Sequence, residues 1–224
     1  MSKTNIDLVE HCKMALRERW GYVWGTFGSV LTEPLLNQRI QQYPSNVGNF
    51  QAFIRSNWMG RRVADCSGLI KSFLWWNNGN PRYNASQDLN ANMMYGRAKR
   101  KGVIGTLPEV VGMGLFKPGH VGVYIGGGQC IEARSTRAGV IQSPVRGAGS
   151  AGWTHWMELP NITYVTTQQQ QHITLDKAVD IIASKGIEID KGYWINHAVP
   201  GRMVKGDYIA IILRRIAEKI QEGL

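Results

Sequence analysis

The chain has 224 residues, of which 43% are hydrophobic and 19% are charged. This composition suits one medium domain, or one domain with a small appendage, and excludes a disordered chain. The formal net charge is +10, which favours an anionic partner such as nucleic acid, a membrane surface or a bacterial wall polymer. No apolar run approaches the roughly 18 residues that cross a bilayer, so no integral membrane segment is expected.

The first residues and the cysteines exclude further classes. Residues 1–7 have no apolar core, so no Sec signal peptide is expected. Cys12, Cys66 and Cys130 are odd in number and widely spaced, which predicts neither a disulfide framework nor a zinc site. No metal or cofactor is expected, and each cysteine is either a small buried residue or a nucleophile.

The first part of the chain has the apolar spacing of helices, and Thr4 is the expected N-cap of the first one. Helices are expected over residues 5–20, near 33–42 and 49–57, from 66 to about 76, and over 88–100. From about residue 113 the period changes to two, with glycine-rich turns in between. Strands are expected at residues 113–116, 121–125, 129–133, 139–143 and 153–159. Helices followed by an antiparallel sheet indicate an α+β fold.

A polar run of two threonines and four glutamines ends in residues 168–171, which are expected to form a linker. The linker separates a domain of residues 1–167 from a module of residues 172–224. Two amphipathic segments, residues 173–184 and 206–220, predict a small helical bundle in the module. Such a module can bind the cell wall, mediate association or cap the first domain.

Cys66 lies where a loop is expected to enter a helix. The free N–H groups of a first helical turn, and the positive end of the helix dipole, stabilise a thiolate and can hold an oxyanion. His120 opens an expected strand, and it can serve as the base if it lies within about 3 Å of the thiol. A buried structural cysteine and a hydrogen-bonded structural histidine are the alternatives.

The strands on either side of three consecutive glycines predict a hairpin. If Tyr124 pairs with Gly128, then His120 lies directly opposite Glu132, and the carboxylate can orient the imidazole. A tight two-residue loop would shift the register by one and move Glu132 to the other face, as a solvent-facing residue. His155 competes for the orienting role, although it lies farther from the hairpin in the sequence.

These segments resemble the NlpC-type cysteine peptidases, which are bacterial cell-wall hydrolases of the papain-like superfamily. The hallmarks stand in order: Tyr-Val-Trp-Gly at 22–25, Asp-Cys-Ser-Gly-Leu-Ile at 65–70, and Gly-His-Val-Gly-Val-Tyr-Ile-Gly at 119–126. The resemblance covers roughly residues 20–160. It implies a papain-like NlpC-type domain in which N-terminal helices pack on a small antiparallel sheet.

The resemblance also implies roles for single residues. Cys66 matches the nucleophile, His120 the base and then acid, and Glu132 the third position, where the family commonly has histidine. Residues that line the substrate side of the nucleophile in relatives correspond to Tyr22, Asp65 and Ser67. Family members usually cleave the bond between D-γ-glutamate and a diamino acid in peptidoglycan, so this bond is the expected target.

The interval between Gly25 and Asp65 is much longer than in the family. This insertion, about residues 26–64, is expected to form a wall or lid of the cleft. Its arginines are candidates for contacts to substrate carboxylates, although a solvated basic loop is the more usual role for any one of them. They are Arg55, Arg61 and Arg62.

The expected function is a peptidoglycan endopeptidase that acts through a thioester. The lack of a signal peptide resembles phage or prophage lysins, so synthesis in the cytoplasm and a phage-type or other non-Sec release are expected. The alternatives are an amidase cutting between muramic acid and L-alanine, a secreted toxin-type amidase, and a wall-binding or nucleic-acid-binding protein. No nucleic-acid-binding motif is present. Residues 1–167 hold +9 of the net charge, so this domain is expected to meet the anionic wall.

Overall fold

The computed structural model describes residues 3–165, 175–198 and 205–221. The chain divides into two compact units, Met1–Val165 and Thr166–Leu224. The expected linker, residues 168–171, lies outside the described residues. Within the described ranges, no helix is long and apolar enough to cross a membrane.

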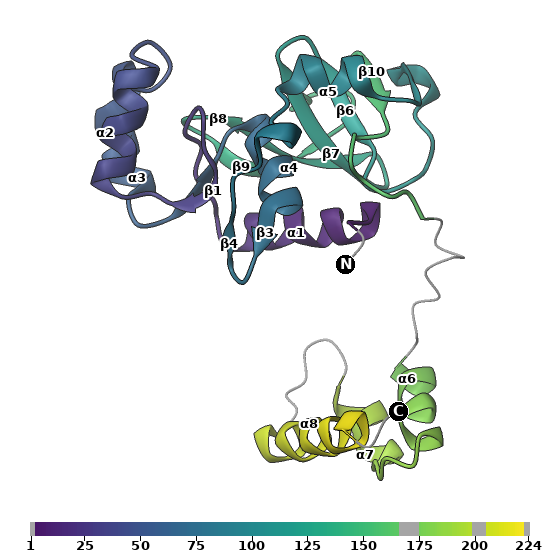
Figure 1. Ribbon diagram of the computed structural model, residues 1–224. Coiled ribbons are helices and arrows are strands. Elements are labelled where there is room, and N and C mark those ends of the chain that lie inside the picture. The colour runs from purple at the N-terminus through teal and green to yellow at the C-terminus, as the bar shows by residue number, and fades with distance from the viewer. Residues whose placement is uncertain (1–2, 166–174, 199–204, 222–224) are drawn as a thin grey trace. The chain divides into compact units, whose positions relative to one another are not determined.

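A six-stranded antiparallel sheet is the framework of the first unit (Figure 1), in the order β5-β10-β6-β7-β8-β9. Its strands are β5 (Lys101–Val103), β6 (Gly114–Lys117), β7 (His120–Gly126), β8 (Gln129–Ser135), β9 (Gly139–Pro144) and β10 (His155–Met157). Helices α1 (Asn5–Arg17) and α4 (Cys66–Trp75) contact β7 and β8, and the largest apolar core includes residues of both helices and both strands. The α+β fold expected from the sequence is therefore confirmed.

Local sequence sets both ends of α1. Thr4 Oγ1 accepts a hydrogen bond from the backbone N–H of Asp7 at 3.2 Å, which confirms the expected N-cap. Arg19 has a left-handed backbone, with φ of 54°, and the N–H of Trp20 donates to the Ala15 carbonyl at 3.0 Å. A left-handed residue with this bond closes a helix. The helix consequently ends at Arg17 and not at residue 20.

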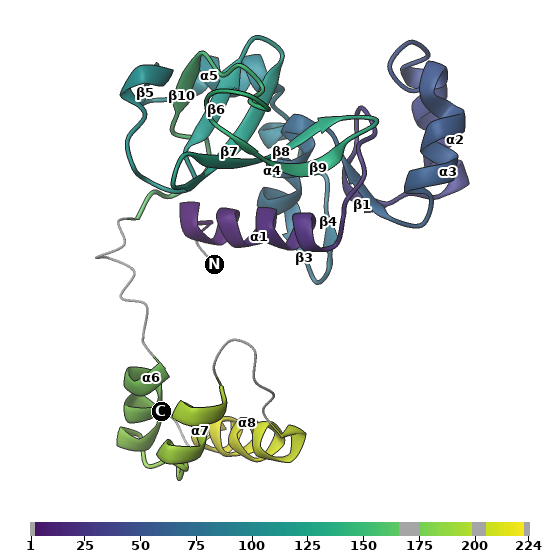
Figure 2. The same ribbon diagram turned by 180° about the vertical axis from the view of Figure 1, so that it is seen from behind.

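The insertion forms a small substructure of its own. β1 (Phe27–Val30) and β2 (Arg62–Ala64) pair antiparallel, and α2 (Glu33–Gln42), η1 (Gly48–Phe50) and α3 (Gln51–Trp58) lie between them in the chain. Its buried core is made of Val23, Leu31, Leu36, Val47, Ile54 and Val63. Figure 2 shows α2 and α3 at the end of the first unit farthest from β5. The two helices were expected, whereas the two strands are too short for alternation to reveal them.

Further short elements connect α4 to the sheet. They are β3 (Trp76–Asn77), β4 (Asn80–Pro81), η2 (Ala85–Gln87), α5 (Ala91–Arg97) and η3 (Ile104–Thr106). The expected helix over residues 88–100 shrinks to α5, because Asn90 caps it: Asn90 Oδ1 accepts the N–H of Met93 at 2.9 Å. The expected strand over residues 153–159 likewise shrinks to β10.

The second unit contains α6 (Leu175–Ser184), α7 (Lys191–His197) and α8 (Gly206–Gln221). α6 and α8 correspond to the two expected helices, and α7 was not predicted. α7 begins after Asp190, whose Oδ1 accepts the N–H of Tyr193 at 2.9 Å. The Tyr193 ring stacks on His197 and on Tyr208, with centroid distances of 4.3 and 4.0 Å. These aromatic side chains therefore pack within the unit.

Candidate active site

Asp65 joins the Tyr-Val-Trp-Gly segment to the start of α4. Its Oδ1 accepts hydrogen bonds from the N–H of Gly68 at 2.6 Å and from Ser67 Oγ at 3.0 Å, so Asp65 is the N-cap of α4. Its Oδ2 accepts the N–H of Gly25 at 2.9 Å. The cap leaves Cys66 as the first residue of α4, where helix N–H groups are free of intrahelical partners.

Gly68 permits this close approach. A Cβ atom at residue 68 would stand 1.9 Å from the carbonyl oxygen of Thr26, a distance that no side chain tolerates. The glycine of the Asp-Cys-Ser-Gly motif therefore allows the backbone after Trp-Gly to pass directly over the first turn of α4. This contact fixes the position of Cys66 relative to the loop before it.

Cys66 is 7% exposed. Burial, followed by the charge of Asp65, raises the pKa of the Cys66 thiol to about 12, although the backbone N–H groups of Val121, Ser67 and Cys66 itself act in the opposite direction. Sγ lies 3.9 Å from the carbonyl oxygen of Gly119. Cys66 is therefore a neutral thiol at rest, and a base has to remove its proton before it can attack. The same N–H groups are placed to stabilise negative charge once it forms.

The candidate base is paired with a carboxylate. His120 opens β7, and its Nε2 lies 2.6 Å from Oε2 of the fully buried Glu132 on β8. The ring of His120 also stacks on Trp153, with centroids 5.1 Å apart and planes at 6°. A carboxylate only accepts, so the neutral imidazole carries its proton on Nε2. Nδ1 is then left with a free lone pair, which is what a general base requires.

The hairpin reaches this arrangement by a route that differs from the expectation. Tyr124 pairs with Cys130, so the predicted pairing with Gly128 is wrong. The turn is a two-residue loop, Gly127 and Gly128, with φ of 58° and 70°, which suits glycine. Such a loop alone would turn Glu132 away from His120. An irregularity between Tyr124 and Gly126 adds one residue to β7 and restores the face.

Glu132 is consequently a diagonal neighbour of His120. Continuing the pairing of Val123 with Ile131 places Glu132 opposite Gly122. A Cβ atom at residue 122 would lie 2.9 Å from Trp153 and 3.3 Å from the Cβ of Glu132. Gly122 therefore leaves the space in which Trp153 covers the imidazole, and the carboxylate reaches His120 across one position.

The second carboxylate oxygen of Glu132 is also held. Oε1 accepts hydrogen bonds from Arg134 Nη2 at 2.6 Å and from Ser143 Oγ at 2.5 Å. Burial raises the pKa of Glu132, but the hydrogen bonds from His120, Arg134 and Ser143 outweigh it and lower the pKa to about 2. Glu132 is thus a fixed carboxylate at neutral pH. Sequence reasoning missed Arg134 and Ser143, although residues two apart on a strand share a face.

His155 takes no part in this set. Its Nδ1 lies 3.0 Å from Thr154 Oγ1, and its ring packs 5.2 Å from that of Tyr95. Glu132 therefore contacts the imidazole of His120, and His155 does not. Among the residues that the structure describes, no three histidine, cysteine, aspartate or glutamate side chains gather where they could hold a metal ion.

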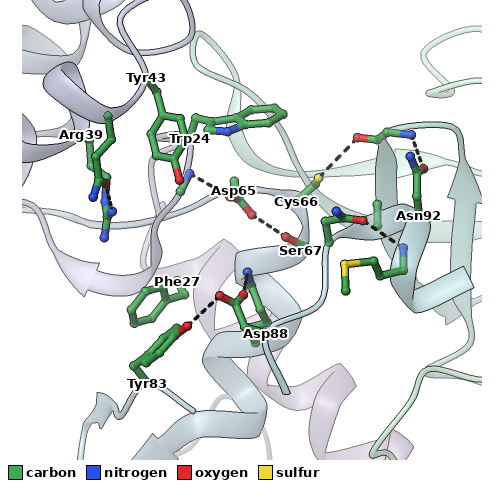
Figure 3. A pocket seen from close by; sticks show the side chains of 17 residues that line it. Trp24, Phe27, Arg39, Tyr43, Asp65, Cys66, Ser67, Tyr83, Asp88 and Asn92 are labelled. Atoms are coloured by element: carbon green, nitrogen blue, oxygen red, sulfur yellow. Dashed lines mark hydrogen bonds and ion pairs between the residues drawn. The ribbon is translucent and has the colours of Figure 1, made fainter. Parts of the chain in front are cut away.

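Cys66 borders a pocket of about 750 Å³ (Figure 3). Asp65 and Ser67, two of the expected substrate-binding residues, also line it. The third, Tyr22, is buried and is not among the lining residues. Burial, and then the charges of Cys66 and Asp65, raises the pKa of the Tyr22 hydroxyl. Tyr22 therefore lies close to the candidate nucleophile but behind the pocket wall.

The insertion contributes to the pocket through an unexpected residue. Arg55 pairs with Glu33 at 3.2 Å, and Arg62 donates to the carbonyl of Gly28 at 2.8 Å. Neither of them, nor Arg61, lines the pocket, so the expected contacts of these arginines to substrate are not supported. Arg39 on α2 lines it instead. Sequence reasoning missed Arg39 because the facing side of α2 depends on how the insertion packs.

A cysteine at a helix start, followed along the chain by a histidine–carboxylate pair on an antiparallel sheet, is the arrangement of papain-like thiol hydrolases. The sequence pattern of the NlpC/P60 family matches residues 55–158. The chain therefore contains a domain of the NlpC/P60 family, as the motifs indicated. The matched range includes Cys66, His120 and Glu132.

Two solved structures are similar to this chain. One is the peptidoglycan hydrolase RipB from Mycobacterium tuberculosis, with 22% identity over 71% of this chain and 67% of that chain, and a TM-score of 0.37. The other is the P60 domain of antigen MAP1204 from M. avium subspecies paratuberculosis, with 21% identity over 71% and 98%, and a TM-score of 0.37. At these TM-scores the similarity does not bear on activity. No curated protein matches the chain.

Proposed function

We propose that the first unit is a cysteine hydrolase that cleaves the peptides of peptidoglycan. The observation that carries the proposal is the placement of Cys66 at the start of α4 together with the 2.6 Å pair of His120 and Glu132 on the adjoining sheet. The NlpC/P60 match and the +9 charge of residues 1–167 support a substrate in the anionic wall. RipB, which is named a peptidoglycan hydrolase, has a similar domain.

The proposed reaction has two steps. His120 Nδ1 takes the proton of Cys66, and the thiolate sulfur attacks the scissile carbonyl carbon, while the N–H groups around Sγ hold the oxyanion. The imidazolium returns the proton to the leaving amine, and a thioester remains. Water then attacks the thioester with His120 as base, which releases the carboxylic acid and restores the thiol. Glu132 stabilises the imidazolium in both steps.

The proposed target is the bond between D-γ-glutamate and a diamino acid, as in other members of the family. An amidase that cuts between muramic acid and L-alanine would use the same side chains on a neighbouring bond. A phage-type or other non-Sec release stays a prediction.

Product analysis on purified peptidoglycans of known stem composition tests the proposal. The expected result is a new free amine on the diamino acid, identified by mass spectrometry. A new amine on L-alanine would identify the amidase instead. Cys66→Ser and His120→Ala are expected to abolish release, whereas the control His155→Gln, outside the pair, is expected to retain it. Unchanged release by Cys66→Ser would refute a cysteine hydrolase.

A further inference from the structure

The insertion builds one side of the pocket that Cys66 borders. α2 and the residue that follows it supply Arg39, Gln42 and Tyr43 to the lining, and α4 supplies Cys66 and Ser67. Figure 3 shows Arg39 and Tyr43 entering from the insertion side, away from Cys66 and Asn92. The insertion is therefore a wall of the pocket, and substrate bound near Cys66 is expected to meet α2.

Arg39 presents an unused edge of its guanidinium. Nη1 donates to Gln42 Oε1, while Nε is buried and has no hydrogen-bond partner. Within the described part of the chain, no carboxylate pairs with Arg39. The bond to Gln42 fixes the guanidinium and leaves the edge formed by Nε and Nη2. A buried donor without a partner is unusual and requires an explanation.

The neighbouring cations differ from Arg39 in this respect. Lys71, the other cation on the pocket wall, pairs with Asp88 at 2.7 Å. Arg55 of the same insertion pairs with Glu33 at 3.2 Å. Arg39 thus brings a positive charge to the pocket that the described protein does not neutralise.

The surroundings of Arg39 strengthen its attraction for an anion. Tyr43, Trp24 and Phe27 line the same pocket, and Trp24 is 38% exposed. Aromatic walls lower the local dielectric constant, so a charge-assisted hydrogen bond is stronger here than in open water. The Nε and Nη2 donors of an arginine match the two oxygens of a carboxylate.

We propose that Arg39 determines specificity by binding a free carboxylate of the peptide side-on, through Nε and Nη2. The inference rests on the proposed function and narrows its substrate class. The enzyme then prefers stem peptides with a free carboxylate near the scissile bond over the same peptides with a carboxamide. A carboxamide has lost the negative charge and one of the two acceptors.

Kinetics on three synthetic peptides tests the proposal. One has all carboxylates free, one has the glutamate α-carboxylate amidated, and one has the C-terminal carboxylate amidated. Amidation of one of these groups is expected to lower kcat/KM of the wild type by about tenfold or more. Arg39→Gln is expected to show a similar loss on the free peptide, through KM, and to lose the discrimination. Arg61→Gln, a matched loss of charge in the same insertion, is expected to keep it.

Discrimination retained by Arg39→Gln, or absent from the wild type, would overturn the proposal. A binding measurement separates this outcome from failure of the proposed function. Calorimetry with Cys66→Ala compares the free and amidated peptides without cleavage, and the double variant Cys66→Ala/Arg39→Gln repeats it. The expected preference for the free peptide disappears in the double variant. Equal affinities in Cys66→Ala refute the role of Arg39, whether or not the wild type cleaves the peptides.

Discussion

Glu132 contacts His120 from a diagonal position on the neighbouring strand, with Nε2 and Oε2 2.6 Å apart. Its other oxygen is held by Arg134 and Ser143. The carboxylate therefore has one fixed orientation, and the imidazole has one fixed tautomer. This relationship makes the acid–base behaviour of His120 depend on a residue that does not touch the substrate.

Replacing Glu132 with glutamine tests this dependence. Glutamine preserves the size of the side chain but cannot stabilise the imidazolium, so we expect kcat to fall by about a hundredfold or more. The measurement is the rate of stem-peptide cleavage, with circular dichroism to confirm folding. Glu109→Gln, which removes a carboxylate that is bonded to Tyr124, is the control. Equal rates for Glu132→Gln and the wild type would remove Glu132 from the mechanism.

The same carboxylate predicts how stability depends on pH. Although burial raises it, the pKa of Glu132 is lowered from 4.5 to about 2 by its hydrogen bonds. A lowered pKa in the folded state contributes stability above pH 4.5, and this contribution is lost as the pH falls towards 2. The loss is on the order of 3 kcal/mol. Urea unfolding across this range is expected to show a smaller pH dependence in Glu132→Gln, and an identical slope in both proteins would contradict the assignment.

The thiol of Cys66 predicts a pH-dependent alkylation rate. Burial, and then the charge of Asp65, raises its pKa to about 12, and only the thiolate reacts. Alkylation by iodoacetamide is therefore expected to be slow near neutral pH and to accelerate up to at least about pH 10. Peptide mapping distinguishes Cys66 from the buried Cys12 and Cys130. A rate that is already constant near neutral pH would show a thiolate at rest.

A methyl group at Gly122 is expected to disturb the site without touching a reacting atom. The added Cβ would stand 2.9 Å from Trp153 and 3.3 Å from the Cβ of Glu132. We expect Gly122→Ala to lower the free energy of unfolding by about 1–3 kcal/mol and to reduce kcat by about tenfold. Gly105→Ala, where a Cβ meets nothing within 4 Å, is the control. Full activity of Gly122→Ala would show that the stacking of Trp153 on His120 is dispensable.

The sequence predicted the α+β fold and the segments that carry Cys66, His120 and Glu132, because helix caps, apolar spacing and short motifs are local properties. It did not predict the register of the hairpin. That register depends on the extra residue between Tyr124 and Gly126, which no local pattern announces. Two errors of opposite effect, in the loop and in the strand, left Glu132 on the expected face.

The insertion shows a second limit of sequence reasoning. Its helices were predictable, but the choice among its arginines was not. Arg55 and Arg62 are bound by other parts of the chain, whereas Arg39 reaches the pocket. Which arginine faces Cys66 is decided by tertiary packing of α2, and this packing is invisible in the spacing of charges.

The central claim is that Cys66 forms a thioester with the acyl part of a stem peptide. Rapid quenching of the reaction, followed by mass spectrometry of the intact protein and its fragments, tests this most directly. The account predicts a transient mass increase equal to the acyl fragment, located on Cys66 and absent from Cys66→Ser. Products released at the normal rate by Cys66→Ser, with no adduct on Cys66 in the wild type, would contradict it.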